Sequence, residues 1–126
     1  MIEESYVSFE VAKLLKEKGF DECTLFSYDK NGNNKDALRP FLESEGDVRR
    51  PTLQMAMKWL REVHRLHCNI GYDNVNWYWD IQTVRKPVTE EAAPKMLPAI
   101  DTIGLTYNTY EEACEAAIKD CLENLI

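Results

Sequence analysis

The segment TYEEACEAAIKDCLENL, residues 109–125, decides the fold class of this chain. Its first four residues match a capping box, in which the Thr109 hydroxyl accepts from the amide of Glu112 and the Glu112 carboxylate reaches back. Apolar residues then recur every three or four positions, as in a helix with one buried face. They are Tyr110, Ala113, Cys114, Ala117, Ile118, Cys121, Leu122 and Leu125. We therefore predict an amphipathic helix from Tyr110 to about Leu125.

Two earlier segments carry the same kind of helix signal. Ser8 and Thr52 are natural N-caps, since their hydroxyls can accept from the free amides of a first helical turn. Gly19 suits the left-handed position after the first helix and would let Phe20 fold back on Leu15. The second helix should end near 64–66. Its predicted inward stripe is Leu53, Ala56, Met57, Leu60 and Val63.

A β-hairpin is predicted over residues 67–84. Apolar residues alternate with polar ones in its first half, and an Asp-Asn turn leads into the aromatic second half, residues 77–84. Alternation places Trp77 and Trp79 on the core face, and Tyr78 and Asp80 on the opposite face. Shorter strands are expected at 23–28 and around 103–107.

These elements predict an α+β fold of about three helices packed on a small antiparallel sheet that contains the 67–84 hairpin. The 126 residues, 44% of them hydrophobic, suit a single domain spanning 1–126 with one core. Two segments rich in turn residues or prolines, about 29–50 and 85–102, are interpreted as long loops.

The composition limits the classes of partner. A formal net charge of -7 and a pI near 4.8 disfavour direct binding to nucleic acid or to an anionic membrane surface. The first residues lack a signal-peptide pattern, and no apolar stretch is long enough to span a membrane, so we expect a cytoplasmic protein. The four cysteines are then expected to be reduced thiols.

Three stretches resemble a group of small uncharacterised proteins encoded by gut Bacteroidales and by their phages and mobile elements. They are YVSFEVAKLLKEKGF (6–20), PTLQMAMKWLRE (51–62) and TYEEACEAAI (109–118). The resemblance covers roughly the three predicted helices. It implies a mobile-element origin and carries no activity.

No catalytic, cofactor or metal site is predicted. His64, His67 and Cys68 are close in sequence, but the helix should end between the two histidines, and a strand would direct His67 and Cys68 to opposite faces. A Cys–His nucleophile pair could be drawn from Cys23 or Cys68 with His64. Nothing local lowers the pKa of a thiol or orients such a pair.

Surface charge is uneven along the chain. Residues 51–86 carry five basic and three acidic side chains, whereas residues 87–126 carry two basic and eight acidic ones. We expect three exposed surfaces to be available for interaction: the outer face of the hairpin, the basic second helix and the acidic start of the last helix. Their residues are Tyr78, Asp80, Arg61, Arg65, Glu111, Glu112 and Glu115.

The leading hypothesis is a non-enzymatic, protein-binding accessory protein of phage or mobile-element origin, with a host or phage protein as its partner. The first alternative is an acidic antagonist that mimics nucleic acid toward a nucleic-acid-binding host protein. The second is a small enzyme whose site is not recognisable from the sequence. The glutamates at the start of the last helix would repel phosphate, which argues against an RNA-binding domain of similar topology. The oligomeric state is left open.

Overall fold

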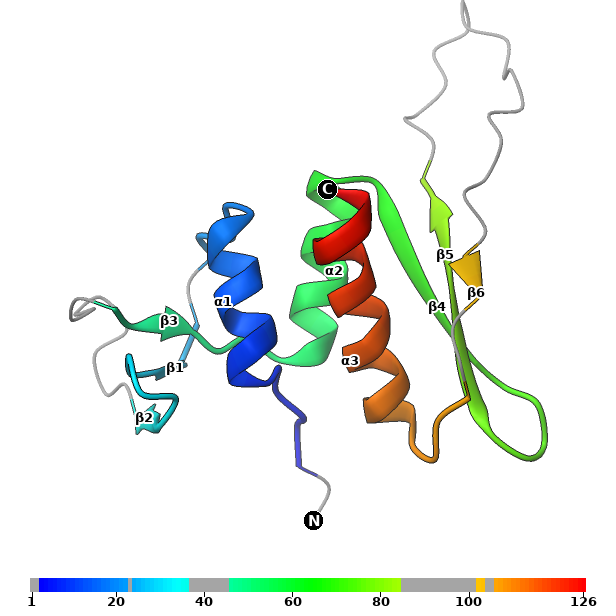
Figure 1. The fold of residues 1–126 in the computed structure, drawn as a ribbon, viewed down its shortest axis with the longest axis horizontal. Coiled ribbons are helices and arrows are strands. Elements are labelled where there is room, and N and C mark those ends of the chain that lie inside the picture. The colour runs from blue at the N-terminus through cyan, green and yellow to red at the C-terminus, as the bar shows by residue number, and fades with distance from the viewer. Residues whose placement is uncertain (1–2, 23, 37–45, 85–101, 104–105) are drawn as a thin grey trace, which may run out of the picture.

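The computed structural model describes residues 3–22, 24–36, 46–84, 102–103 and 106–126. These residues form an α+β fold of three α-helices and two three-stranded antiparallel sheets (Figure 1). The helices are α1 (Phe9–Glu17), α2 (Leu53–Val63) and α3 (Tyr110–Asp120), the last continued by a π-helical turn at Cys121–Leu125. The strands are β1 (Phe26–Tyr28), β2 (Asn34–Asp36), β3 (Val48–Arg49), β4 (Leu66–Tyr72), β5 (Trp77–Thr83) and β6 (Thr102–Ile103).

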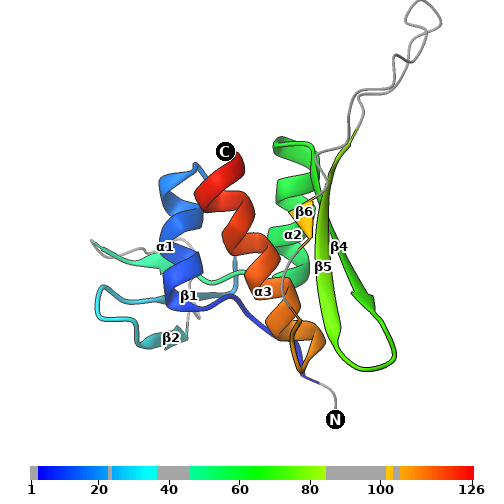
Figure 2. The same cartoon turned by 45° about the vertical axis from the view of Figure 1, so that its right-hand side comes forward.

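The predicted hairpin is confirmed as β4 and β5, which pair antiparallel with Ile70 opposite Trp79. β6 adds to the far side of β5, so the strand order is β4-β5-β6. α2 packs on β4, and α3 packs on both hairpin strands, so that the helices lie on one side of this sheet (Figure 2). Trp79 and Ile81 are buried on that side, as the alternation predicts.

The second sheet, in the order β2-β1-β3, was not predicted. The interpretation of 29–50 as a long loop is wrong where it contains β2 and β3, while residues 37–45 lie outside the described residues. The Asp29 carboxylate accepts from the amides of Asn31 at 2.8 Å and Asn33 at 2.9 Å, and this turn returns the chain alongside β1. Strands of two or three mainly polar residues show no period, which is why the sequence pattern missed them.

The loop predicted at 85–102 lies almost wholly outside the described residues. Its last residue, Thr102, belongs to β6, which pairs with β5. Tyr107 forms an isolated bridge with Trp77. A strand near 103–107 is therefore confirmed only in part.

The predicted helix ends are largely confirmed. The Ser8 hydroxyl accepts from Val11 N at 3.2 Å, and Gly19 has a φ of +93° with Phe20 N donating to Leu15 O at 2.9 Å. Thr109 Oγ1 accepts from Glu112 N at 3.1 Å. The return arm of the capping box differs, because the Glu112 carboxylate accepts from the amide of Asn108.

One residue of the predicted α2 stripe is misplaced. Val63 is 57% exposed, whereas Trp59 is buried and packs edge-on against Phe20 with ring centroids 5.4 Å apart. α2 ends at Val63, one residue before its C-cap His64. Leu60, in the same last turn, is completely buried, so the apolar face of α2 is covered there and Val63 lies outside it.

A single hydrophobic core joins all three helices and both sheets. The α3 stripe lies at its centre, with Cys114, Ala117, Ile118 and Cys121 completely buried. Leu15, Leu60 and Ile81 contribute from α1, α2 and β5. No helix of the described residues is both long and apolar enough to cross a membrane.

The hairpin also depends on a contact between Gly71 and Tyr78, which are paired across its outer face. A Cβ built on Gly71 would lie 2.3 Å from Tyr78 Cζ, so the tyrosine ring lies directly over the glycine. Covering a strand glycine in this way compensates for its missing side chain.

We expect Gly71→Ala to destabilise the fold by roughly 1 kcal/mol, because the new methyl group displaces the Tyr78 ring. In a Tyr78→Ala background the same substitution should be neutral or stabilising, since alanine suits a strand better than glycine. Urea unfolding of the two single variants and the double variant measures this coupling. If the changes in the free energy of unfolding of the two single variants add up to that of the double variant, the ring does not occupy the space over Gly71.

Candidate binding groove between α1 and α3

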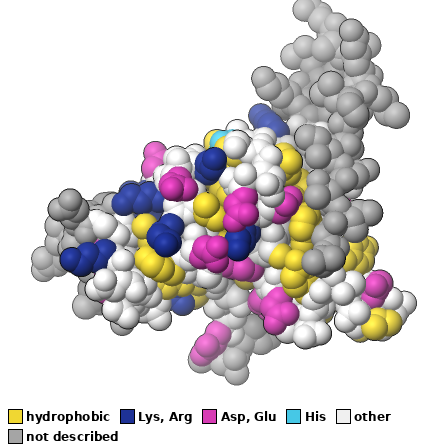
Figure 3. Space-filling model, in the orientation of Figure 1, with side chains coloured by type: hydrophobic (Ala, Val, Ile, Leu, Met, Phe, Trp, Pro, Cys, Tyr) yellow, Lys and Arg dark blue, Asp and Glu magenta, His cyan; other side chains and the backbone are white. Residues whose placement is uncertain are grey.

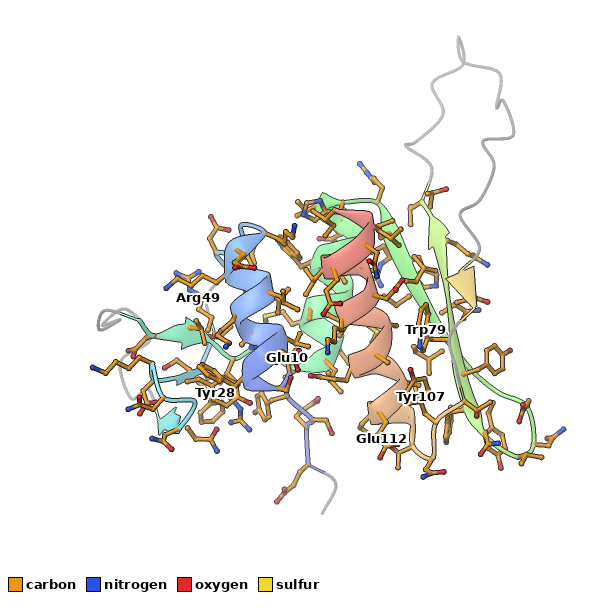
Figure 4. All side chains as sticks on the ribbon, in the orientation of Figure 1. Glu10, Tyr28, Arg49, Trp79, Tyr107 and Glu112 are labelled. Carbon is orange, nitrogen blue, oxygen red and sulfur yellow. The ribbon has the colours of Figure 1, made fainter. Side chains whose placement is uncertain are left out.

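A groove of about 850 Å³ lies between the N-terminal segment, α1 and the first turns of α3. Figure 3 shows acidic side chains over the seam between these helices, and Figure 4 shows Glu10 between α1 and α3 and Glu112 at the start of α3. Five carboxylates line the groove: Glu4, Glu10, Glu111, Glu112 and Glu115. Two cations, Arg50 and Lys119, and an apolar set that includes Val11, Leu53 and Ala116 complete it.

The carboxylates converge because the helices begin at the same end of the molecule, as the ribbon in Figure 1 shows. Glu10 stands in the first turn of α1, and Glu111 and Glu112 stand in the first turn of α3. Carboxylates are favoured at those positions because the free amides of a helix start carry a partial positive charge. A preference that is local to each helix thus becomes a shared acidic surface once the helices are packed side by side.

Backbone and carboxylate contacts hold the two walls of the groove together. Ser8 N, at the start of α1, donates to Glu115 Oε1 of α3 at 3.0 Å. Lys119 Nζ lies 2.8 Å from Glu10 Oε1 and 3.8 Å from Glu123 Oε1. The hydrogen bond and charge of Lys119 lower the pKa of Glu10, and Glu10 in turn raises the pKa of Lys119.

Two of the five carboxylates differ from the others in their bonding. Glu10, Glu112 and Glu115 each accept from, or pair with, a group of the same chain. Glu4 and Glu111 are exposed, and neither forms a hydrogen bond or ion pair with another described residue. They are therefore the acceptors most readily offered to a ligand.

Arg50 lies at the end of the groove nearest the β2-β1-β3 sheet. Its guanidinium carbon is 4.3 Å from the ring centroid of Tyr6 and 5.3 Å from that of Tyr28. Such cation–π contacts direct the charge at ring faces. Arg50 thus joins the N-terminal segment to the sheet.

The residues predicted from the sequence as interaction surfaces separate into three places. Glu111, Glu112 and Glu115 meet at the groove. Arg61 and Arg65 are half-buried around the end of α2, where Arg65 has a φ of 58° as the chain turns into β4. Tyr78 and Asp80 lie on the outer face of β5.

Three residues that line the groove were not predicted from the sequence: Glu4, Glu10 and Lys119. A signal for Glu10 was present, since a carboxylate in a first helical turn is favoured by the helix dipole. Nothing local indicated that this turn would face the start of α3, because the two segments are about a hundred positions apart, as the 107-residue separation between Ser8 and Glu115 illustrates.

The residues considered for a metal or nucleophile site go to separate environments. The His64 ring packs on Trp59 with centroids 4.7 Å apart, and Cys68 is buried with its Sγ 3.8 Å from Cys121 Sγ. His67 lies on the face of β4 opposite to that of Cys68. Among the described residues no three His, Cys, Asp or Glu side chains gather as metal ligands would. Cys23 lies outside the described residues.

Two of the buried thiols, Cys114 and Cys121, have raised pKa values, which favour the protonated form. Burial raises the pKa of Cys114 to about 11. The hydrogen bond with Cys68 and burial both raise the pKa of Cys121. Since the thiolate is the reactive species, these groups serve as core side chains at neutral pH.

Comparison of the chain with known proteins finds no matching family model, no matching curated protein and no matching solved structure.

We expect Cys68, Cys114 and Cys121 to resist alkylation at neutral pH in the folded protein and to react at once after unfolding. A Cys23→Ser variant isolates these three thiols for a colorimetric thiol titration with and without urea. Rapid reaction of all three thiols in the folded state would show that they are not buried in solution.

We expect the pKa of Glu10 to lie below its ordinary value of 4.5 and to return toward it in Lys119→Met. The Glu10–Lys119 pair stabilises the fold above the ordinary glutamate pKa, and this contribution is lost as pH falls through the lowered value. On the alkaline side it is lost as pH rises through the raised pKa of Lys119. Carboxyl chemical shifts followed by NMR measure the effect, with Glu123→Gln as the control that leaves the 2.8 Å pair intact.

Proposed function

We propose that this protein is a non-enzymatic accessory protein that binds a basic segment of a partner protein in the groove between α1 and α3. The observation that carries the proposal is the convergence of five carboxylates and only two cations around an apolar floor. A lysine or arginine side chain suits such a site, because its aliphatic stem covers apolar surface while its charged end reaches carboxylates.

The electrostatic balance supports a cationic ligand. The helix starts contribute about half a positive charge each, whereas every carboxylate contributes a full negative charge. Concave surfaces lined by one sign of charge concentrate the field and raise the rate of encounter with an oppositely charged partner. The cations in the groove are already engaged, Lys119 with Glu10 and Arg50 with aromatic rings.

Glu4 and Glu111 provide the specific contacts in this proposal. Both are exposed and line the groove, one from the segment before α1 and the other from the first turn of α3. A partner side chain that pairs with either one breaks no hydrogen bond or ion pair with another described residue. Glu112 and Glu115, in contrast, stabilise helix starts and shape the groove.

The resemblance to proteins of phages and mobile elements supports a host or phage protein as the partner. An acidic antagonist is the more specific version of this function, in which the groove occupies a surface that normally binds nucleic acid. The two versions differ in competition. Nucleic acid should displace the protein from an antagonised partner and should leave a simple adaptor complex intact.

We expect Glu4→Gln with Glu111→Gln to weaken binding of a labelled peptide of alternating arginine and leucine about tenfold, since each exposed charge contact contributes roughly 0.5–1 kcal/mol. Fluorescence anisotropy at low salt measures the affinity. Binding should also weaken as salt is raised, because exposed charges are screened beyond about 10 Å at 0.1 M salt.

The matched control is Glu22→Gln with Glu62→Gln. It removes the same charge from a different depression, beside Trp59 and Val63, and should leave the affinity unchanged. Equal losses of affinity in both double variants would show that binding depends on net charge alone. No loss in the groove variant would contradict the proposed site.

A further inference from the structure

β4 is an edge strand with an open side. Among the described residues, the order β4-β5-β6 leaves one side of β4 without a neighbouring strand. No backbone hydrogen bond or isolated bridge joins this outer side to another described residue. The strand is seven residues long, whereas β6, at the opposite edge, has two.

The direction of each β4 peptide group follows from bonds at the two ends of the hairpin. Val84 N donates to Arg65 O at 2.7 Å, and Asp73 N donates to Asn76 O at 3.1 Å. In an antiparallel ladder, hydrogen-bonded pairs alternate with non-bonded pairs. His67, Asn69 and Gly71 therefore bond to β5.

The alternate residues direct both their N–H and C=O groups away from β5, toward the open side. They are Leu66, Cys68, Ile70 and Tyr72. The same alternation accounts for Trp77, which exchanges bonds of 2.8 and 2.7 Å with Tyr107 on the other side of β5. The agreement between the two sides of the sheet confirms the assignment.

This edge lacks the devices that usually prevent strand pairing. Residues 66–72 contain no proline, lysine, arginine, aspartate or glutamate. Proteins commonly protect an edge with charges, prolines, bulges or very short strands. Tyr72, at the end of the strand, is 53% exposed, and Val75 in the adjoining turn is 76% exposed.

We propose that β4 pairs antiparallel with β4 of a second copy of this chain, about a two-fold axis at Ile70. The two sheets then form one continuous sheet, with Cys68 of each copy opposite Tyr72 of the other. This interface is isologous, so the outward peptide groups of Cys68, Ile70 and Tyr72 each meet a complementary group of the other copy.

The side chains fit this register. Ile70 meets its own counterpart, and the exposed Tyr72 rings gain neighbours across the axis. On the outer face, His67 of one copy lies opposite Asp73 of the other, and Asn69 lies opposite Gly71. No like charges face each other across the paired strands, which would destabilise such a pair.

The dependence on salt concentration distinguishes this dimer from the proposed binding of a basic segment, on which it does not rest. Each copy carries a formal net charge of -7, so the copies repel at low salt, while residues 66–72 of the paired strands contain no lysine, arginine, aspartate or glutamate. Dimerisation should strengthen as salt is raised, whereas peptide binding in the groove should weaken. Failure of either proposal leaves the other independently testable.

The test combines analytical ultracentrifugation with amide hydrogen exchange followed by NMR over a range of protein concentrations. We expect a dimer whose formation slows exchange at Cys68, Ile70 and Tyr72. The amides of His67, Asn69 and Gly71 should be protected at every concentration, because they bond to β5. A monomer at all concentrations, or a dimer with its concentration-dependent protection elsewhere, overturns the proposal.

Tyr72→Pro removes an outward amide without removing a bond to β5. We expect its dimer dissociation constant to rise roughly 10- to 100-fold, as two symmetry-related hydrogen bonds are lost. Tyr72→Ala is the matched control, since it loses the ring and keeps the amide, and its dimer should be the stronger of the two. Equal weakening in both variants would overturn backbone pairing. The exchange pattern of the unaltered protein decides the question if the proline variant does not fold.

Discussion

Burial of the α3 stripe is the constraint on which the rest of the structure depends. Ala113, Cys114, Ala117, Ile118, Cys121 and Leu122 are all completely buried. α3 contacts α1, α2 and both hairpin strands, and α1 in turn contacts β3 of the second sheet. Small side chains at Ala113 and Ala117 let the helix approach its neighbours closely, and the larger Ile118 and Leu122 fill the space between them.

The acidic groove is a consequence of this packing. The helices begin at one end of the molecule, so their first turns and N-terminal extensions are brought together. Carboxylates that are individually favoured at helix starts then line one concave surface, where Lys119 and the amide of Ser8 neutralise part of the charge. Helix orientation, rather than a contiguous motif, creates the candidate site.

The groove and the β4 edge provide two different kinds of recognition on one small domain. The groove offers charge over an apolar floor, whereas the edge offers main-chain donors and acceptors with no charge of its own. They belong to different elements, so a dimer formed through β4 would present two grooves to a partner. Two linked sites of this kind raise the apparent affinity for a partner with repeated basic segments.

The sequence by itself determined the elements whose signals are local. Caps at Ser8, Thr52 and Thr109 act within three residues, and the helical and strand periods follow from side-chain direction. Tertiary structure alone decided the pairing of β2 and β3 with β1, the exposure of Val63 and the meeting of Glu4, Glu10 and Glu111. The reason is physical: a cap or period is set by neighbours along the chain, whereas strand partners and shared surfaces depend on the relative placement of distant segments.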